Sequence, residues 1–242
     1  MVRIRDKIAD GRVLKLIEAF LVQGVLEGLE TWTPTSGSPQ GAVISPLLSN
    51  AYLDPLDHLM AVQAVEMVRY ADDFVILCRS DAEAWAALEQ VQHWTADAGL
   101  TLHPRKTRIV DANQEGFDFL GYHFERGKRW PRDKSTKKFK DAIRAKTPRT
   151  HGHSLSVIIA NVNRTTWGWF EYFKQTSYTT VFGDLDGWIR RRLRRLLLKR
   201  CGRSRHSGLG TAHQRWPNAF FAERGLFSME AAHVRLRQSV VR

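Results

Sequence analysis

Hydrophobic positions in the N-terminal part of the chain change between helical and strand spacing. Apolar residues recur at helical spacing over residues 12–26, and a second helix is expected to open at Ser45, where a proline occupies the first turn. Residues 31–41 are rich in Thr, Ser, Pro and Gly, which predicts a loop. The apolar runs Val65–Tyr70 and Phe74–Cys78 then predict two strands joined by a turn.

A third helix is expected after this strand pair. Ser80 and Glu83 have the spacing of a capping box, and Gly99 suits the position just beyond the end of a helix. The residues predicted to face inward are Trp85, Leu88 and Val91. Further strands are expected at residues 107–111 and 117–124, around a turn at Gly116.

The pattern changes after Gly127. Residues 126–150 are densely basic, and three helical patterns follow: one behind Ser154, one behind Asp184 and one over residues 228–238. We expect a domain boundary near 126–131. The aromatic residues of the first pattern have the spacing of a buried stripe, so helix core is favoured for them and a base-stacking platform is the alternative; they are Trp167, Trp169 and Phe170.

Charge is distributed unevenly along this 242-residue chain. Hydrophobic residues make up 43% and aromatic residues 10%, which is typical of a globular protein. The net charge of +12 divides into −7 for residues 1–103 and +19 for residues 104–242, where 30 Lys and Arg face 11 Asp and Glu. The basic part predicts a region that binds a polyanion.

Several protein classes are disfavoured by the same sequence. No apolar run approaches the roughly 20 residues of a membrane-spanning helix, and the first residues do not resemble a signal peptide. The cysteines, Cys78 and Cys201, belong to no CxxC pair, so neither a disulfide framework nor a cysteine-based zinc site is predicted. We therefore expect a protein of the reducing cytoplasm that has no membrane partner.

The candidate chemistry lies between the two predicted strands, at Ala71-Asp72-Asp73. Two adjacent carboxylates in a tight turn repel each other unless a cation binds between them, and Mg²⁺ prefers carboxylate oxygens. Paired metal ions of this kind serve phosphoryl and nucleotidyl transfer. An aspartate-rich turn with no such role is the alternative, since turns favour Asp in any case.

Neighbouring motifs favour the chemical interpretation. In chain order they are Ser38-Pro39-Gln40-Gly41 with Ile44–Asn50, Arg69–Asp73, Leu102–Thr107, Phe119–Tyr122, Trp167–Phe173 and Trp188–Leu193. Over nearly its whole length the chain thereby resembles the group II intron-encoded reverse transcriptases, which are also maturases. Each motif is weak by itself, but their order and spacing are mutually consistent.

This resemblance implies a fold, an activity and partners. The implied fold is α+β, with a partial right-hand polymerase palm (an antiparallel sheet with helices) over residues 1–125 and an all-α thumb/maturase region over residues 131–242. The implied activity is RNA-directed DNA polymerisation by a two-metal mechanism. The implied partners are group II intron RNA, bound for splicing and mobility, an RNA/DNA template-primer and a dNTP.

Individual roles are also implied by the resemblance. Asp72 and Asp73 are the implied catalytic residues and ligands of Mg²⁺, which Mn²⁺ can replace. The implied contacts to nucleotide and template are Gln40, Gly41, Tyr70 and Lys106, and the implied primer grip is Phe119, Leu120 and Gly121. A plain loop, strand-core or surface role is the alternative for several of these residues.

A run of basic residues in the second helical pattern predicts RNA contact independently. Residues 188–200 contain seven Lys and Arg and no acidic residue, whereas solvated faces usually mix signs. Arginine binds phosphate through two parallel hydrogen bonds. The predicted RNA-binding residues are Arg190, Arg191, Arg194 and Arg195.

The chain also departs from the family pattern. The family's further palm carboxylate lies in a motif that precedes the segment resembling residues 1–30, and Asp6, Asp10, Asp54 and Asp57 do not match it. The basic fingers and an HNH-type endonuclease are likewise expected to be absent. Three hypotheses follow: a reverse transcriptase segment, an RNA-binding maturase remnant without catalysis, and a degenerate fragment. We accordingly expect no primer extension by this chain alone.

Overall fold

The computed structural model describes residues 1–22, 24–27, 30–32, 43–148, 150, 152–201 and 209–240. The chain divides into two compact units, Met1–Ile109 and Val110–Arg242. Both contain helices and small antiparallel sheets, so the coarse α+β prediction is confirmed. Within the described residues, no helix is long and apolar enough to span a membrane.

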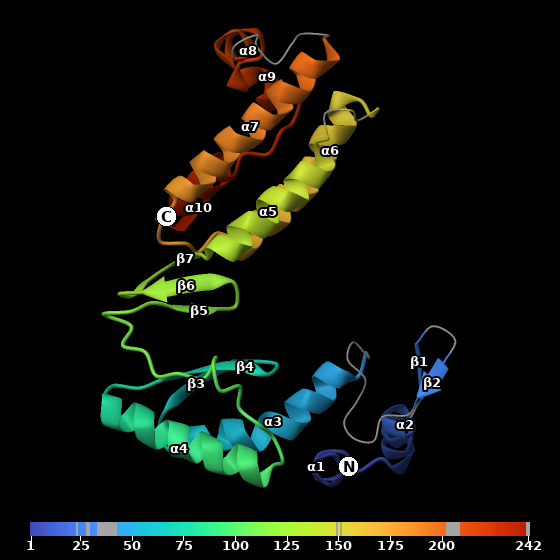
Figure 1. Ribbon diagram of the computed structural model, residues 1–242, viewed down its shortest axis with the longest axis vertical. Helices are drawn as coiled ribbons and strands as arrows, with labels where there is room; N and C mark the ends of the chain where they lie inside the picture. Colours follow the sequence, from blue (N-terminus) through green and yellow to red (C-terminus); the bar gives the residue numbers. More distant parts are fainter. Residues whose placement is uncertain are drawn as a thin grey trace. The chain divides into compact units, whose positions relative to one another are not determined.

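The first unit combines helices with two short hairpins (Figure 1). Its elements are α1 (Val2–Arg5), α2 (Gly11–Val22), β1 (Val25–Glu27), β2 (Glu30–Trp32), α3 (Ser45–Val62), β3 (Glu66–Tyr70), β4 (Asp73–Leu77) and α4 (Asp81–Asp97). The predicted helix at Ser45 and the predicted strand pair are thus confirmed. Strand β1 pairs with β2, and β3 pairs with β4.

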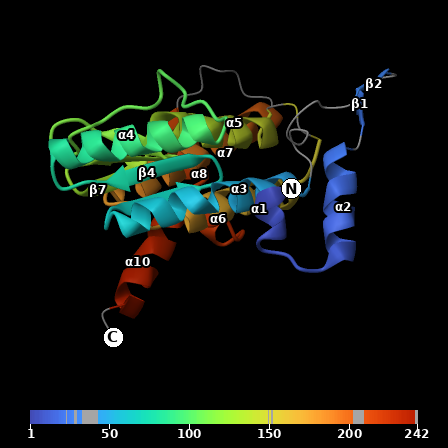
Figure 2. The ribbon, with the colours of Figure 1, turned by 90° about the horizontal axis from the view of Figure 1, so that it is seen from below.

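The β3–β4 hairpin lies against α3 and α4, as Figures 1 and 2 show from two directions. Alternation along the strands directs Met67, Phe74 and Ile76 toward these helices, where they pack on a core formed by Leu56, Met60 and Val91. The opposite face of the hairpin stays open, and Val68 and Tyr70 are exposed there. The helices therefore support the hairpin from one side only.

Three predictions for the first unit are wrong in detail. The helix expected over residues 12–26 ends at Val22, and Gly24, a poor helix former, precedes β1. Trp85 is 59% exposed although it was predicted to face inward. Residues 107–111 form no strand, because the backbone on either side bonds locally: Thr107 N–H donates to His103, and Glu115 N–H donates to Asp111.

The start of α4 follows the expected capping pattern in part. The Ser80 hydroxyl accepts a hydrogen bond from the backbone N–H of Glu83 at 3.2 Å. The Glu83 carboxylate accepts from the backbone N–H of Arg79, one residue before the cap. Gly99 has φ +68° just beyond the helix, as expected for a terminating glycine.

The second unit is a three-stranded sheet followed by helices. Its elements are β5 (Phe117–Phe119), β6 (Tyr122–Glu125), β7 (Lys128–Pro131), α5 (Asp133–Lys146), α6 (Leu155–Phe173), α7 (Thr180–Arg200), α8 (Leu209–Arg215), α9 (Asn218–Ala222) and α10 (Met229–Val240). Figure 1 shows α5, α6 and α7 side by side, with the sheet at one end of them. The sheet belongs to this compact unit, while the domain boundary expected near 126–131 stays a prediction.

Helices of this unit share one apolar core. Fully buried members include Ile143 from α5, Ile158 and Val162 from α6, and Ile189 and Leu193 from α7. The helical pattern behind Ser154 is confirmed as α6, and the pattern over residues 228–238 is confirmed as α10. The pattern behind Asp184 forms α7, but this helix already starts at Thr180, so Asp184 lies inside it and is not its cap.

Helix α5 was not predicted. Its sequence carries Lys or Arg at six positions, and only two of its side chains, Phe139 and Ile143, are buried. These two residues are one turn apart, so the apolar stripe is too narrow to stand out among the charges. The helix forms because that stripe packs on the core of the unit.

Tight turns connect the three strands, and the first turn is locked against the helices. The strand predicted over residues 117–124 is in fact a hairpin that turns at Leu120 (φ +47°) and Gly121 (φ +82°), not at Gly116. The Gly121 carbonyl accepts the Ser135 hydroxyl at 2.9 Å and the Arg132 N–H at 3.0 Å. A Cβ at Gly121 would lie 3.2 Å from that hydroxyl oxygen.

We expect Gly121→Ala to destabilise the second unit more than Gly127→Ala does. Gly127 has a similar positive φ of +69° in the next turn, but a Cβ there would meet nothing within 4 Å. Each substitution should cost about 1 kcal/mol for the left-handed backbone, and Gly121→Ala should additionally displace Ser135. Urea unfolding of the two variants measures the difference. Equal losses would show that the Ser135 contact adjusts freely.

Candidate active site and nucleic-acid interface

The predicted catalytic carboxylates lie at the tip of the β3–β4 hairpin. Tyr70 pairs with Asp73, which leaves Ala71 and Asp72 as a two-residue turn. Ala71 adopts φ +55°, a left-handed conformation that is uncommon for a residue with a Cβ. Both Asp72 and Asp73 are exposed, and they lie at the turn that was expected between the two strands. The position presents two adjacent carboxylates to solvent.

Arg69 fixes this turn to helix α3. Its guanidinium makes two parallel hydrogen bonds to the Asp57 carboxylate, at 2.7 and 2.5 Å. The same group donates to the Asn50 side chain and to the Ala71 carbonyl, each at 2.9 Å. The hydrogen bond to Asp57 raises the pKa of Arg69 above its usual value. One partly buried guanidinium thus joins the helix to the turn that carries Asp72.

Sequence reasoning missed the role of Arg69, although a signal was present. Strand alternation places Arg69 on the same face as Met67, toward α3, where an apolar residue is normally expected. A charged residue on an inward-facing position requires a partner. Asp57, which the sequence left without a function, provides it from a helix twelve residues earlier.

Carboxylates on α3 are engaged with cations of the first unit. The Lys7 ammonium lies 2.6 Å from Asp54, and this hydrogen bond lowers the pKa of that carboxyl. Asp57 is held by Arg69. Across the described residues, no group of three or more His, Cys, Asp or Glu side chains is arranged to hold a metal ion. The carboxylates at the tip of the hairpin are those of Asp72 and Asp73, and metal binding by them stays a prediction.

The other predicted nucleotide and template contacts lie in different environments. Tyr70 is 67% exposed on the open face of the hairpin, beside Asp73. Lys106 is exposed in a turn after α4, where its backbone N–H donates to the His103 carbonyl at 3.1 Å. Gln40 and Gly41 lie outside the described residues. The structure brings Tyr70 together with the carboxylates and leaves the roles of Lys106, Gln40 and Gly41 as predictions.

The predicted primer-grip residues form the first turn of the second unit. Two tyrosines hold this turn reciprocally: the Tyr172 hydroxyl donates to the Leu120 carbonyl at 2.7 Å, and the Tyr122 hydroxyl donates to the Tyr172 carbonyl at 2.6 Å. Burial raises the pKa of Tyr122. Phe119 and Tyr122 face each other across the strands. The turn is therefore bound to α6 and to the start of α5.

The four predicted RNA-binding arginines of α7 fall into two groups. Arg191 and Arg195 are exposed, and Arg190 is half-buried. Arg194 is only 4% exposed, so the prediction that it contacts RNA is wrong. Its guanidinium donates to the Trp216 carbonyl at 2.8 Å and to the Asn218 side chain at 2.7 Å, and it lies over the Phe221 ring.

The physical reason is that Arg194 ties α7 to α9 and the segment before it. A buried guanidinium needs hydrogen-bond partners, and these acceptors supply them. Burial, together with Arg190 and Arg191 nearby, lowers the pKa of Arg194. The leucine-rich stripe of the helix is thus wider than the sequence pattern indicated, and one arginine falls within it.

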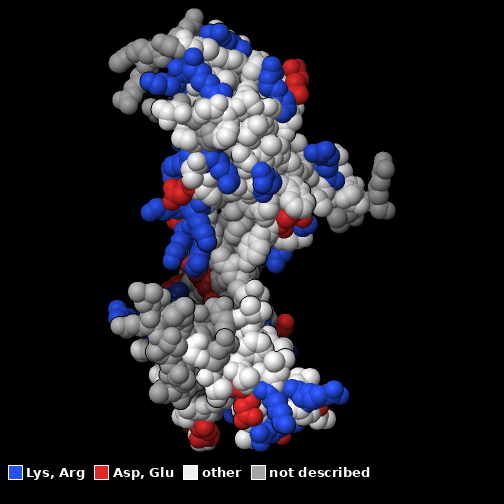
Figure 3. Space-filling view, turned by 90° about the vertical axis from the view of Figure 1, so that its right-hand side faces the viewer, with Lys and Arg blue, Asp and Glu red and all other residues white. Residues whose placement is uncertain are grey.

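Exposed basic side chains on α5 adjoin those on α7. Arg144 and Arg192 both lie over the Trp188 ring, at 5.6 and 5.4 Å from its centre, and Arg192 also donates to Thr147 at the end of α5. We call six of the exposed cations along these two helices the basic strip: Lys134, Lys137, Lys138, Arg144 (which also pairs with Asp141), Arg191 and Arg195. On the face of the second unit that Figure 3 shows, Lys and Arg side chains are more frequent than Asp and Glu.

Comparison with known proteins identifies the two parts of the chain. Residues 6–124 match the reverse transcriptase (RNA-dependent DNA polymerase) family, and residues 136–216 match the group II intron maturase-specific domain. The group II intron-encoded protein LtrA of Lactococcus lactis subsp. cremoris is 47% identical over 54 residues, which are 22% of this chain and 9% of LtrA.

Two further relatives align over longer stretches. Protein YkfC of Escherichia coli (strain K12) is 28% identical over 161 residues, 52% of this chain and 42% of YkfC. An uncharacterized 91 kDa protein in the cob intron of Schizosaccharomyces pombe is 25% identical over 184 residues, 52% of this chain and 23% of that protein. The alignments thus span less than half the length of each of these relatives.

The two family matches follow each other along the chain and both indicate a protein of the reverse transcriptase class. More specifically, the chain belongs to the group II intron reverse transcriptase/maturase family.

We expect Arg69→Ala to lower the stability of the first unit by about 2 kcal/mol, because it removes hydrogen bonds to a charged group and leaves Asp57 unpaired. Arg69→Lys should recover only part of this, since an ammonium cannot bind the carboxylate in the same two-point manner. Lys7→Ala is the matched control: its pair with Asp54 is exposed to solvent, so its loss should lower the stability far less than Arg69→Ala does. Denaturant unfolding measures all three.

Proposed function

We propose that residues 1–125 act as a reverse transcriptase palm whose metal-binding residues are Asp72 and Asp73. The observation that carries this proposal is the anchored hairpin tip, with two adjacent exposed carboxylates, in a chain of the reverse transcriptase family. The donor set suits Mg²⁺, because hard divalent ions prefer carboxylate oxygens. Adjacent like charges also favour a cation between them.

The residues of the chain would then act as follows. Asp72 and Asp73 hold the metal ions, and Arg69 keeps the turn in the conformation that presents these carboxylates. Bound in a pair, such ions stabilise the attacking and leaving oxygens of nucleotidyl transfer from a dNTP. Tyr70, Lys106, Gln40 and Gly41 contact the nucleotide and template, and Phe119, Leu120 and Gly121 position the primer.

A second function is RNA binding by residues 131–242 as a thumb/maturase region, and it does not require catalysis. The basic strip favours it, because exposed cations fixed on packed helices can neutralise phosphates of a structured RNA, and the half-buried Arg190 is proposed to add to this charge. Group II intron RNA is the proposed partner, in keeping with the maturase-specific match. Mutating the palm carboxylates would leave this binding intact.

The metal site predicts a specific response to Mn²⁺. In the wild-type chain, Mn²⁺ should broaden amide NMR signals of the hairpin tip around Asp72 selectively. Asp72→Asn keeps the shape of the side chain but removes its charge, so the broadening should weaken strongly. The control is Asp97→Asn, an exposed carboxylate at the end of α4, which should leave the effect unchanged. Equal broadening in wild type and Asp72→Asn would refute the site.

RNA binding predicts a change in salt dependence. Replacing Arg190, Arg191 and Arg195 with Gln should weaken binding to structured RNA and flatten the log–log salt slope by roughly two to three units, since each lost phosphate contact removes a little less than one unit. Arg194 is left intact because it holds the fold.

A matched control removes the same charge from the first unit, through Arg5, Arg12 and Lys15, which are also exposed. This control should bind with the wild-type slope. Affinity at several salt concentrations, with circular dichroism to verify folding, measures both variants. If the slopes of the two variants agree, α7 is only a solvated surface and the proposed RNA interface is wrong.

A further inference from the structure

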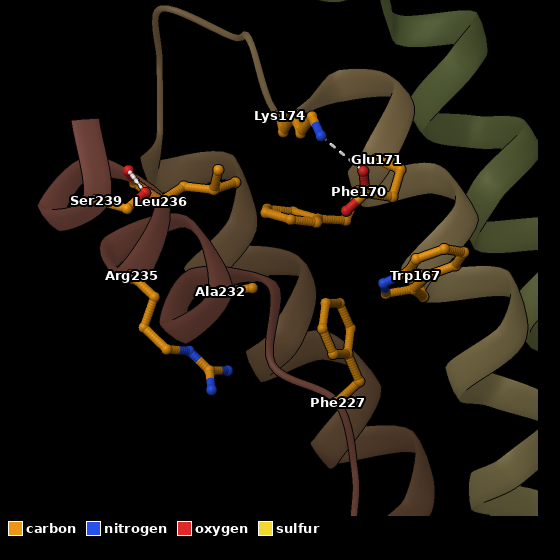
Figure 4. A pocket seen from close by; sticks show the side chains of 9 residues that line it. All are labelled: Trp167, Phe170, Glu171, Lys174, Phe227, Ala232, Arg235, Leu236 and Ser239. Carbon is orange, nitrogen blue, oxygen red and sulfur yellow. Dashed lines mark hydrogen bonds and ion pairs between the residues drawn. The ribbon is translucent and has the colours of Figure 1, made fainter.

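A groove lies between α6 and α10 in the second unit (Figure 4). Each helix lines it with residues at positions i, i+3, i+4 and i+7, beginning at Trp167 on α6 and at Ala232 on α10. Phe170 and Phe227, whose ring centres are 5.7 Å apart, contribute its apolar surface. The groove holds roughly 390 Å³, a volume typical of pockets for small ligands or single chemical groups.

The walls of the groove are held in place by polar contacts at the start of α10. The Asn163 side chain on α6 donates to the Gly225 carbonyl at 2.7 Å and accepts from the Phe227 N–H at 2.9 Å. The buried Asp186 carboxylate on α7 accepts the Ser228 hydroxyl at 2.7 Å and two backbone N–H groups of the first turn of α10. A ligand would therefore meet a preformed site.

Trp167 is the anomalous residue of this site. The sequence pattern placed it in the core with Trp169 and Phe170, and those two do pack there, against Phe139 and Phe182 respectively. Because each residue turns an α-helix by about 100°, Trp167 falls on the side of α6 away from Trp169. Its indole is 58% exposed and borders the groove. A large aromatic face is thus available for stacking.

The charges around this aromatic face favour an anionic ligand. Glu171 is the acidic residue among those that line the groove, and Lys174 pairs with it at 2.7 Å. Arg235, at the outer edge in Figure 4, donates through Nε to the Ala231 carbonyl at 3.3 Å and has no carboxylate partner in the described part of the chain. The groove therefore combines an exposed indole with an available guanidinium.

We propose that this groove binds one nucleotide of single-stranded RNA, with the base stacked on Trp167 and a phosphate bound by Arg235. The proposal rests on the RNA-binding function and extends it, because the basic strip offers cations but no exposed aromatic ring. Aromatic side chains and cations together are the usual means of holding unpaired nucleotides, while duplex RNA conceals its bases from stacking. The groove would give the protein a preference for unpaired segments.

The test compares the affinity of the full chain for three probes at one salt concentration: a single-stranded oligouridylate, an abasic ribose-phosphate oligomer of equal charge, and an RNA duplex. Trp167→Ala should weaken binding of the oligouridylate by roughly 5- to 100-fold, the range expected for one base–aromatic stack. Trp167→Phe should keep most of the affinity. Neither variant should change binding of the abasic oligomer or the duplex.

Trp85→Ala is the matched control, because Trp85 is 59% exposed in the first unit and should not affect any probe. Arg235→Gln should weaken binding of the oligouridylate and of the abasic oligomer alike. An unchanged affinity of Trp167→Ala for the oligouridylate would overturn the proposal, as would an equal loss on the abasic oligomer.

Two further outcomes separate this proposal from the RNA-binding function on which it rests. If wild type dimerises and Trp167→Ala does not, the groove serves a second copy of the chain and the nucleotide proposal is wrong. If the triple arginine variant of α7 loses RNA affinity while Trp167→Ala binds normally, RNA binding stands and the groove proposal fails. If the arginine variant binds normally and Trp167→Ala does not, the groove binds RNA and the proposed RNA interface on α7 is wrong.

Discussion

The candidate active site depends on the pairing of Arg69 with Asp57. A two-residue turn that carries adjacent carboxylates is an unfavourable structure, because the negative charges repel and Ala71 occupies the left-handed region. Arg69 stabilises the strained backbone of this turn, because its guanidinium donates directly to the Ala71 carbonyl. The same guanidinium also binds Asn50 and Asp57, so the position of the turn is fixed relative to α3. Helix α3 and the β3–β4 hairpin, which are separate motifs in the sequence, are therefore held together by this one side chain.

The second unit shows how one residue type serves two purposes on one helix. Arg191 and Arg195 are exposed, whereas Arg194 between them is buried and donates hydrogen bonds to Trp216 and Asn218. The buried acid of the same helix, Asp186, has a parallel role: it caps α10, and burial raises its pKa in spite of three accepted hydrogen bonds. Polar groups inside this core define which helices meet, while the exposed cations remain available for a partner.

In each of the two units, hydrogen bonds from a few side chains fix the orientation of a candidate binding surface. In the first unit, a guanidinium orients the acidic hairpin. In the second unit, the hydroxyls of Tyr172 and Ser135 orient the turn at Leu120 and Gly121. Asp186 and Asn163 orient α10 and so shape the groove beside Trp167. In the second unit these side chains bind the backbone of another element, whereas Arg69 binds side chains of α3 and the backbone of its own turn; in both units directional hydrogen bonds add to the apolar contacts.

The sequence by itself determined the main elements and the chemistry of the hairpin. Alternation over residues 65–78 predicted β3 and β4, Ser154 marked the start of α6, and the order of short motifs indicated the family. These features are local: they depend on spacing within one segment, and spacing can be read from the chain. The same local spacing did not predict α5, because its buried apolar stripe consists of only two residues, Phe139 and Ile143, among many charged ones.

Only the tertiary structure decided which polar residues face inward. Arg194 looks like a surface residue in the sequence, and Trp167 and Trp85 look like core residues, yet each has the opposite environment. Burial of a side chain depends on which other element packs beside it, and that partner can lie far away along the chain, as Asp57 does for Arg69 and Trp216 does for Arg194. The spacing of apolar residues predicts which face of a helix or strand is buried. It does not predict how many residues beside that face a neighbouring element also covers.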